Sequence, residues 1–201
     1  MKTPAFLDPY APFDKRRPEV GLDGLTDDQR RSHNFAKRLL VPLLVVFLAA
    51  FLVFYVFFDF SKVDGSSMYP TLHDTDHVLI TKGVASPKRG DVVVLSVIDQ
   101  RAPAEWVKRI VAVAGDKVSV RGDIVTVNGA PESFPHQIVN GGGTRPLRDL
   151  VVPPDTVYCM GDDRPVSLDS RYVGPFTVSQ LHGKVVAVYS PMTRIRLVPG
   201  P

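Results

Sequence analysis

The 201-residue chain has little cysteine and little excess charge. Cys159 is its one cysteine, which excludes an internal disulfide and a metal site built from several thiolates. Lys and Arg number 24 against 21 Asp and Glu, and residues 59–201 hold sixteen against fifteen. A nucleic-acid surface needs a basic patch or stripe, so no nucleic-acid partner is expected. Apolar residues make up 44% of the chain, enough for one ordinary domain with appendages.

What the chain has in abundance is one apolar run, residues 39–58, in which sixteen of twenty residues are Leu, Val or Phe. At about 1.5 Å per residue it spans roughly 30 Å, the thickness of bilayer hydrocarbon. A helix buried in a protein core rarely has so long an unbroken apolar run. A cleaved signal peptide has a shorter apolar core, followed by a small-x-small cleavage site. Residues 59–64 contain no such site. We therefore predict a retained transmembrane helix, with Pro42 in its first turn, where a missing N–H matters least.

The basic residues lie mainly before this run. Arg30, Arg31, Lys37 and Arg38 precede it closely, whereas Lys62 is the only basic residue among the twenty that follow. The positive-inside rule then places the N-terminus in the cytoplasm. We expect a single-pass protein of the cell (inner or plasma) membrane whose residues 59–201 are extracytoplasmic.

Three segments follow from these patterns. Residues 1–38 form a cytoplasmic tail, residues 39–58 the transmembrane helix, and residues 59–201 an extracytoplasmic β-rich domain. The tail is expected to be largely flexible because residues 1–22 hold four prolines and little periodicity. A helix is expected from Leu25, with Thr26 as its N-cap, and could run into the span.

Beyond residue 58 the pattern is typical of β-structure, and no helical periodicity of useful length is present. Short segments rich in Val, Ile or aromatic residues are bounded by Gly, Pro or Asp. Asn128-Gly129 and Gly122-Asp123 are turn signals, and residues 141–143 predict a mobile glycine loop. These features favour a mainly β fold, a barrel or a sandwich-like domain. The expected strands are His77–Thr81, Asp91–Val97, Trp106–Val113, Lys117–Val120, Ile124–Val127, Thr156–Met160 and Lys184–Ser190.

A candidate nucleophile, Ser67, follows the apolar run. It stands after the tight-turn sequence Asp64-Gly65-Ser66 and shortly before Pro70, which restricts Tyr69 to extended conformations. A stiffly held serine suits a nucleophile whose own N–H helps to stabilise an oxyanion. Taken alone, a Ser-Ser pair before a Pro turn is more often structural, and that alternative stays open.

A candidate base, Lys108, lies in a strand pattern of period two. Trp106, Lys108, Ile110 and Ala112 share one face, and Arg109 lies on the other. Burial disfavours the charged form of an amine and lowers its pKa, so a neutral Lys108 could accept a proton from a serine hydroxyl. An edge-strand lysine that reaches water is the alternative.

Other groups offer weaker chemistry. The stretch from His73 to His77, which includes Asp74 and Asp76, could belong to a Ser-His-Asp triad or a metal site, but an exposed loop explains it more simply. Cys159 beside Met160 in a strand pattern favours packing over nucleophilic attack. We therefore expect neither a metal nor a cofactor.

A polar segment, residues 161–174, is dense in charge and hydroxyl groups. Ser167, Asp169 and Arg171 alternate, so in an extended chain their side chains would point the same way. Asp169 could pair with Arg171, and the Ser167 hydroxyl could bond the amine of Lys108. This segment is therefore a plausible support for a neutral lysine.

Four sequence blocks follow one another behind the apolar anchor. They are Gly65-Ser66-Ser67-Met68-Tyr69-Pro70-Thr71-Leu72, Arg89-Gly90-Asp91-Val92-Val93-Val94, Val107-Lys108-Arg109-Ile110-Val111 with Gly115-Asp116-Lys117-Val118, and Gly161-Asp162-Asp163-Arg164 through Ser167-Leu168-Asp169-Ser170-Arg171. In this order they resemble the bacterial type I signal peptidases, the Ser/Lys leader peptidase family, and the resemblance covers the anchor and nearly all of residues 59–201.

The resemblance implies that Ser67, not Ser66, is the nucleophile and that Lys108 is the general base. It further implies that Ser167 orients the lysine and that Asp169 and Arg171 support the loop.

The resemblance also implies a β-rich domain that associates with the membrane surface and a serine endopeptidase that removes signal peptides from secretory preproteins. Cleavage would follow small residues at positions −1 and −3. The substrate would dock as a strand between two walls. Those walls would be Val63, Asp64 and Gly65 on one side and Glu105, Trp106 and Val107 on the other.

Some positions depart from the family pattern. Gly65 stands where some members have a serine that donates to the oxyanion, Asp163 replaces Asn, Ala114 replaces a common Pro, and Pro165-Val166 replaces polar residues. The short stretch from 121 to 150 predicts a small accessory β domain. Two alternatives remain: a related Ser/Lys peptidase for a pilin or conjugation protein, and an inactive relative that acts in binding or assembly.

Overall fold

The computed structural model describes residues 27–99, 102–122, 124–132, 138–139, 147–198 and 200. Residue contacts divide the chain into two units, residues 1–52 and 53–201. The predictions for the tail (residues 1–22), for the N-cap Thr26 and for the glycine loop (residues 141–143) lie outside the described residues.

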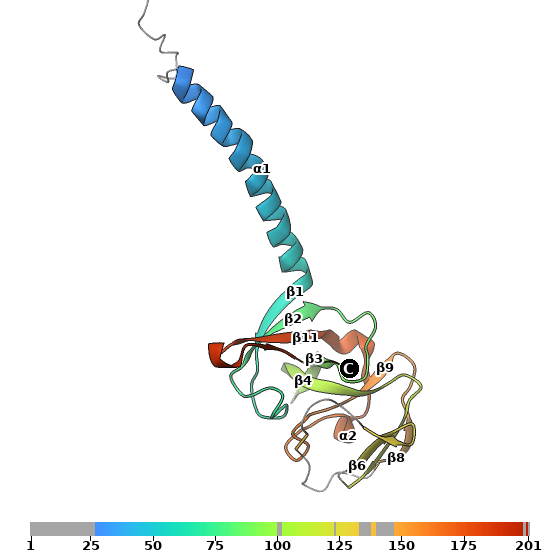
Figure 1. Cartoon of the computed structure of the whole chain (residues 1–201). Helices are drawn as coiled ribbons and strands as arrows, with labels where there is room; N and C mark the ends of the chain where they lie inside the picture. Colours follow the sequence, from blue (N-terminus) through green and yellow to red (C-terminus); the bar gives the residue numbers. More distant parts are fainter. Residues whose placement is uncertain are drawn as a thin grey trace, which may run out of the picture. The chain divides into compact units, whose positions relative to one another are not determined.

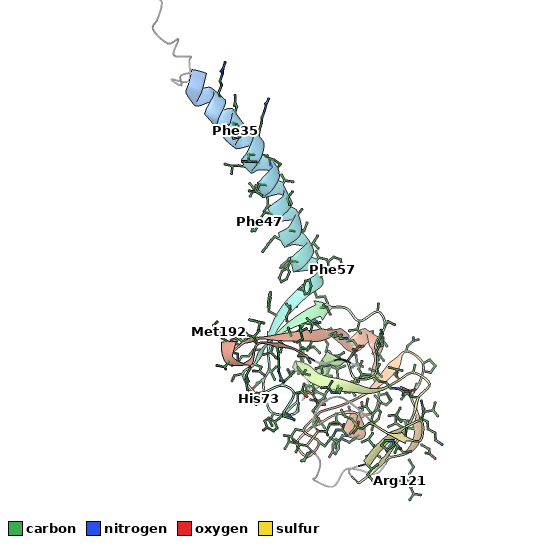
Figure 2. The ribbon with its side chains drawn as sticks, viewed as in Figure 1. Phe35, Phe47, Phe57, His73, Arg121 and Met192 are labelled. Atoms are coloured by element: carbon green, nitrogen blue, oxygen red, sulfur yellow. The ribbon has the colours of Figure 1, made fainter. Side chains whose placement is uncertain are left out.

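The first helix, α1, runs from Asp27 to Phe57. Its segment Lys37–Phe57 is long and apolar enough to cross a membrane, and no part of that segment is buried by the protein. The exposed side chains of Phe35 and Phe47 project outward from α1 (Figure 2). A helix that is apolar all round yet uncovered is typical of a membrane span. The prediction for Pro42 is wrong: because the helix begins at Asp27, Pro42 lies in its interior.

The second unit begins with the last turn of α1 and contains two antiparallel sheets (Figure 1). The larger sheet has the strand order β1-β2-β11-β3-β4-β9-β10, and β12 pairs with β11. Strand β4 therefore lies inside the sheet, between β3 and β9. The bounds are β1 (Phe58–Lys62), β2 (His77–Lys82), β3 (Val92–Asp99), β4 (Ala102–Val113), β9 (Thr156–Met160), β10 (Phe176–Thr177), β11 (Leu181–Ser190) and β12 (Arg196–Leu197).

The smaller sheet is an insertion between β4 and β9, with the strand order β7-β6-β5-β8. At the predicted turn between β6 and β7, Asn128 and Gly129 both have positive φ, 55° and 83°, as a type I′ turn requires. The small accessory β domain expected from the sequence is thus confirmed. The bounds are β5 (Lys117–Arg121), β6 (Ile124–Val127), β7 (Ala130–Pro131) and β8 (Leu147–Val151).

Helical structure after α1 is short in the described part of the chain. It consists of α2 (Ser170–Val173) and two 3-10 turns, η1 (Val178–Gln180) and η2 (Met192–Arg194). The mainly β fold is therefore confirmed. All seven expected strands are present, whereas β1, β7, β8, β10 and β12 were not predicted.

A β-bulge in β4 changes which side chains share a face. Arg109 pairs with Met160 and Ile110 with Cys159, but Ala112 pairs with Tyr158, so Val111 is the extra residue. Ile110 packs in the apolar cluster with Cys159, while Val111 and Ala112 both pack in the cluster that joins the two sheets. The predicted alternation is correct up to Ile110 and wrong for Ala112, because a bulge interrupts the period of two.

Candidate active site

Ser67 lies in a tight turn that follows β1. The backbone N–H of Tyr69 donates to the Ser66 carbonyl oxygen at 2.8 Å, and the buried side chain of Met68 anchors the turn in the core. Gly65 has φ +89°, a conformation that favours glycine, and its N–H donates to Asp74 Oδ1 at 3.0 Å. The predicted stiff turn is present, and its contacts present the Ser67 hydroxyl toward β4.

Lys108 reaches Ser67 from the middle of the sheet. It pairs with Val93 of β3, its side chain is buried, with 4% exposure, and a hydrogen bond of 2.8 Å joins its Nζ to Ser67 Oγ. Nζ also donates to the Val107 carbonyl oxygen at 3.0 Å. Since β4 is an interior strand, the alternative of an edge-strand lysine in water is wrong.

Burial decides the charge state of this amine. It lowers the pKa of Lys108 from 10.5 to about 8, although the nearby acids Asp169, Cys159 and Asp162 act to raise it; the Arg171 guanidinium lowers it further. A substantial fraction of Lys108 is therefore neutral at mildly alkaline pH, and a neutral amine can accept the proton of a hydroxyl.

An ion pair between Asp169 and Arg171 stabilises the polar segment that follows β9. Arg171 donates to Asp169 from Nε (to Oδ1) and from Nη2 (to Oδ2), each at 2.8 Å, and Asp169 Oδ2 accepts from the Gly161 N–H at 3.0 Å. The predicted pair is present but its expected geometry is wrong. Asp169 is the N-cap of α2, so the segment is helical at Arg171 rather than extended.

Ser167 is buried in the same segment, beside Ser67. A Cβ added to Gly161 would overlap both the Ser167 hydroxyl and the Ser67 carbonyl oxygen, so only glycine permits this approach. Asp163 N–H donates to that carbonyl oxygen at 3.0 Å. The expected bond from Ser167 to Lys108 is not formed: within the described residues Ser167 Oγ has no hydrogen-bond partner.

A cavity of about 380 Å³ opens at the Ser67–Lys108 pair. All six residues expected to bind substrate line it: Val63, Asp64, Gly65, Glu105, Trp106 and Val107. Among the lining residues that sequence reasoning missed are Val166 and Leu168, which are 60% and 45% exposed. Their signal was present in the sequence, since both are apolar and flank the inward-facing Ser167. The remaining lining residues are Ser61, Lys62, Ser66, Met68 and Val94.

The comparisons with known proteins show the family of the chain. Residues 36–190 match the family model described as signal peptidase, peptidase S26. The chain belongs to the signal peptidase S26 family. It is 34% identical to signal peptidase I of Bacillus amyloliquefaciens over 77% of this chain and 87% of that one. It is 32% identical to signal peptidase I S of Bacillus subtilis (strain 168) over 81% and 91%.

Among solved structures, signal peptidase I of Enterococcus faecalis V583 aligns with a TM-score of 0.41 and 25% identity, over 51% of this chain and 98% of that one. Family membership identifies the chain as a serine peptidase, and the apolar span of α1 fits a membrane-anchored member.

In this S26 member the two aspartates between His73 and His77 have structural roles. Asp74 accepts from the Gly65 N–H, and the buried Asp76 accepts from the His73 N–H at 2.8 Å and pairs with Arg194. Within the described residues no three His, Cys, Asp or Glu side chains gather in a way that could hold a metal.

Cys159 is fully buried, and burial raises the pKa of its thiol. A thiol in that state is a poor nucleophile. The packing role favoured by the sequence is confirmed, since Cys159 lies in an apolar cluster.

Proposed function

We propose that this S26 family member removes N-terminal signal peptides from exported preproteins, with Ser67 as nucleophile and Lys108 as general base. One observation carries the proposal: a buried amine whose pKa is about 8 lies 2.8 Å from a serine hydroxyl in a substrate-sized cavity. Burial brings the pKa of the lysine to about 8, and proton transfer is most efficient when the pKa of the base lies near the pH at which the enzyme acts.

The reaction has two stages. The Ser67 hydroxyl proton passes to Lys108 Nζ while Oγ attacks the scissile carbonyl carbon, and the Ser67 N–H contributes to stabilising the oxyanion. The C–N bond then breaks, and the Lys108 ammonium returns the proton to the leaving amine of the mature chain. Water, deprotonated by Lys108, attacks the acyl-enzyme ester. The bond between the acyl carbon and Ser67 Oγ then breaks, the Lys108 ammonium returns the proton to Oγ, and the signal peptide is released.

Ser167 is proposed to orient Lys108, and the Asp169–Arg171 pair to hold the loop that carries Ser167. The buried Ser167 hydroxyl lacks a partner in the described part of the chain, and an unmade bond of this kind costs about 1–3 kcal/mol. A bond to the Lys108 amine would remove that cost.

The substrate is proposed to bind as an extended strand between the wall of Val63, Asp64 and Gly65 and the wall of Glu105, Trp106 and Val107. Side chains two positions apart in a strand face the same way, so residues −1 and −3 would both face the cavity floor. Val63 and Met68, whose side chains are buried in the core, line this cavity. We expect small residues at −1 and −3 because large ones would meet these buried side chains.

Residues 39–58 are proposed to anchor the enzyme in the cell (inner or plasma) membrane, with residues 1–38 cytoplasmic and residues 59–201 extracytoplasmic, as the basic flank indicates.

Aromatic and apolar side chains on the surface of the second unit support its association with lipid. The Phe60 ring lies 5.8 Å from that of Phe54 and 5.4 Å from that of Tyr189, and Leu197 of β12 is exposed. Figure 2 places Met192 toward the Phe57 end of this unit and Arg121 at the opposite end.

Cleavage of a preprotein with Ala at −1 and −3 by the purified full chain tests the function. We expect release of the mature chain, its loss in Ser67→Ala and Lys108→Ala, and its retention in the control His73→Ala. Full activity in Lys108→Ala with loss in His73→Ala would overturn the mechanism. Preprotein binding without cleavage would favour the inactive relative, and cleavage restricted to a pilin would favour the specialised peptidase.

Membrane orientation is tested separately by protease protection. In inside-out vesicles residues 59–201 should be protected, and in right-side-out vesicles they should be digested. The reverse pattern would exclude an extracytoplasmic site.

A further inference from the structure

One carboxylate connects the smaller sheet to the loop of the active site. Glu132 follows β7, the edge strand of that sheet, and Arg164 lies in the segment that carries Ser167. Arg164 Nη2 donates to Glu132 Oε2 at 2.9 Å, and Nη1 lies 2.6 Å from Oε1. The side chains are only 2% (Arg164) and 10% (Glu132) exposed, so solvent screens this pair little.

Arg164 is tied to the rest of the loop by further bonds. Its Nε donates to the Gly161 carbonyl oxygen at 2.9 Å, and its own carbonyl oxygen accepts from Arg171 Nη2 at 2.8 Å. Arg164 thus connects the start of the loop, through its guanidinium, with the Asp169–Arg171 pair at the end of the loop, through its backbone carbonyl. A displacement of Arg164 would be transmitted to both ends.

A second contact with the same insertion holds the backbone of the loop. Val139 N–H donates to the Asp162 carbonyl oxygen at 2.9 Å, and Arg164 N–H donates to the Val139 carbonyl oxygen at 3.0 Å. These bonds form a parallel bridge between Val139 and Asp163. Glu132 therefore binds the loop through the Arg164 side chain, and Val139 binds it through the backbone of Asp162 and Arg164.

The part of the loop so held is the part that touches the nucleophile. Asp163 N–H donates to the Ser67 carbonyl oxygen at 3.0 Å, and Gly161 approaches that oxygen closely. The six residues of the two substrate walls belong to the segment after β1 and to β4, and from the loop Val166 and Leu168 also line the cavity. Through Gly161 and Asp163, however, the loop acts directly on the position of Ser67.

We propose that Glu132 is a positioning residue of the peptidase: by holding Arg164 it keeps residues 161–171 in the arrangement that sets Ser67 against Lys108. This proposal rests on the proposed Ser67/Lys108 function. It gives the inserted sheet a role in the reaction although, among the described residues, none of that sheet lines the active-site cavity.

The test is Glu132→Gln, which keeps the side-chain shape and removes the charge, in the full-length purified enzyme. Loss of alignment is expected to lower kcat roughly ten- to hundredfold while KM changes by less than about threefold. Because a loosened loop admits water to Lys108, the acid limb of the kcat–pH profile should also move to higher pH. The control is Asp149→Asn, which removes a carboxylate from an exposed ion pair with Lys117 on the same sheet and should leave both measurements unchanged.

Two further variants make the result decisive. Glu132→Asp retains the charge and should recover part of kcat; it also serves if Glu132→Gln fails to fold. Arg164→Gln should lower kcat, and adding Glu132→Gln to it should cause little additional loss, because both changes break the same pair.

The outcomes separate the two proposals. If the unaltered chain fails to cleave preprotein, the proposed function is wrong. If it cleaves, and folded Glu132→Gln shows the same kcat and the same acid limb well below its unfolding temperature, the role of Glu132 is wrong. Additive losses in the double variant would also overturn it.

Discussion

Arg109 binds Asp162 through two hydrogen bonds inside the protein, 2.9 Å from Nε to Oδ1 and 2.7 Å from Nη2 to Oδ2. Both side chains are fully buried. The guanidinium also donates to the Gly90 carbonyl oxygen at 2.6 Å, and the Thr71 hydroxyl donates to Asp162. Arg109 follows Lys108 in β4 but points to the opposite side of the strand. The same strand therefore carries the candidate base and, through Asp162, binds the loop of residues 161–171.

Removal of one partner of this buried pair should be strongly destabilising. Asp162→Asn leaves the Arg109 guanidinium without its counter-charge, and we expect a loss of roughly 3–5 kcal/mol in the free energy of unfolding. Urea denaturation followed by circular dichroism measures it. Lys117→Ala, which removes half of an exposed pair with Asp149, is the control and should cost no more than about 1 kcal/mol. Equal losses in the two variants would contradict the prediction.

Activity should depend on pH through Lys108. Burial lowers its pKa to about 8, and only the neutral amine accepts the Ser67 proton, so kcat should rise with pH through this region and level off above it. Steady-state cleavage from about pH 6 to about pH 9 shows the acid limb. A flat profile across that range would exclude a lysine base.

Burial of the Lys108 amine should also lower the free energy of unfolding at neutral pH. The pKa of Lys108 is about 8 in the folded protein against 10.5 for an ordinary lysine, so between these values the unfolded chain binds more protons and stability rises with pH. The full rise corresponds to about 3 kcal/mol. Lys108→Met should remove this rise and be more stable at neutral pH while inactive. Urea denaturation at a series of pH values tests it, and an unchanged pH dependence in the variant would refute it.

A methyl group on Gly161 should disrupt the site. The added Cβ would overlap the Ser167 hydroxyl and the Ser67 carbonyl oxygen, which forces the loop away from the nucleophile. Gly161→Ala should therefore lower kcat/KM by about a hundredfold or more. Gly200→Ala is the control, because its Cβ would meet Lys184 Nζ at an ordinary 3.5 Å. Wild-type kinetics in Gly161→Ala would show that the loop tolerates the displacement.

The strands that sequence reasoning identified are those rich in Val, Ile or aromatic residues, such as β3 and β9. It missed β8 (Leu147–Val151), in which two charged residues interrupt the pattern, and β1, which directly follows the apolar run. It expected a small accessory β domain but gave the strand order of neither sheet. Which strands pair depends on contacts between distant segments, and a single bulge at Val111 changes the face of every residue after it.

The sequence by itself determined the anchor, the β-rich domain behind it and the residues of the candidate site, because hydrophobic length, strand periodicity and the order of short motifs are local properties. Only the tertiary structure decided that Lys108 reaches Ser67, that Asp169 caps a helix, and that Arg109 binds Asp162 and Arg164 binds Glu132. The contacts of Lys108, Arg109 and Arg164 join segments tens of residues apart, so they depend on register and close packing. The cap at Asp169 is local, but its loop is held by the surrounding fold. The lowered pKa of Lys108 arises in the same way, because desolvation is produced jointly by all the elements that bury the amine.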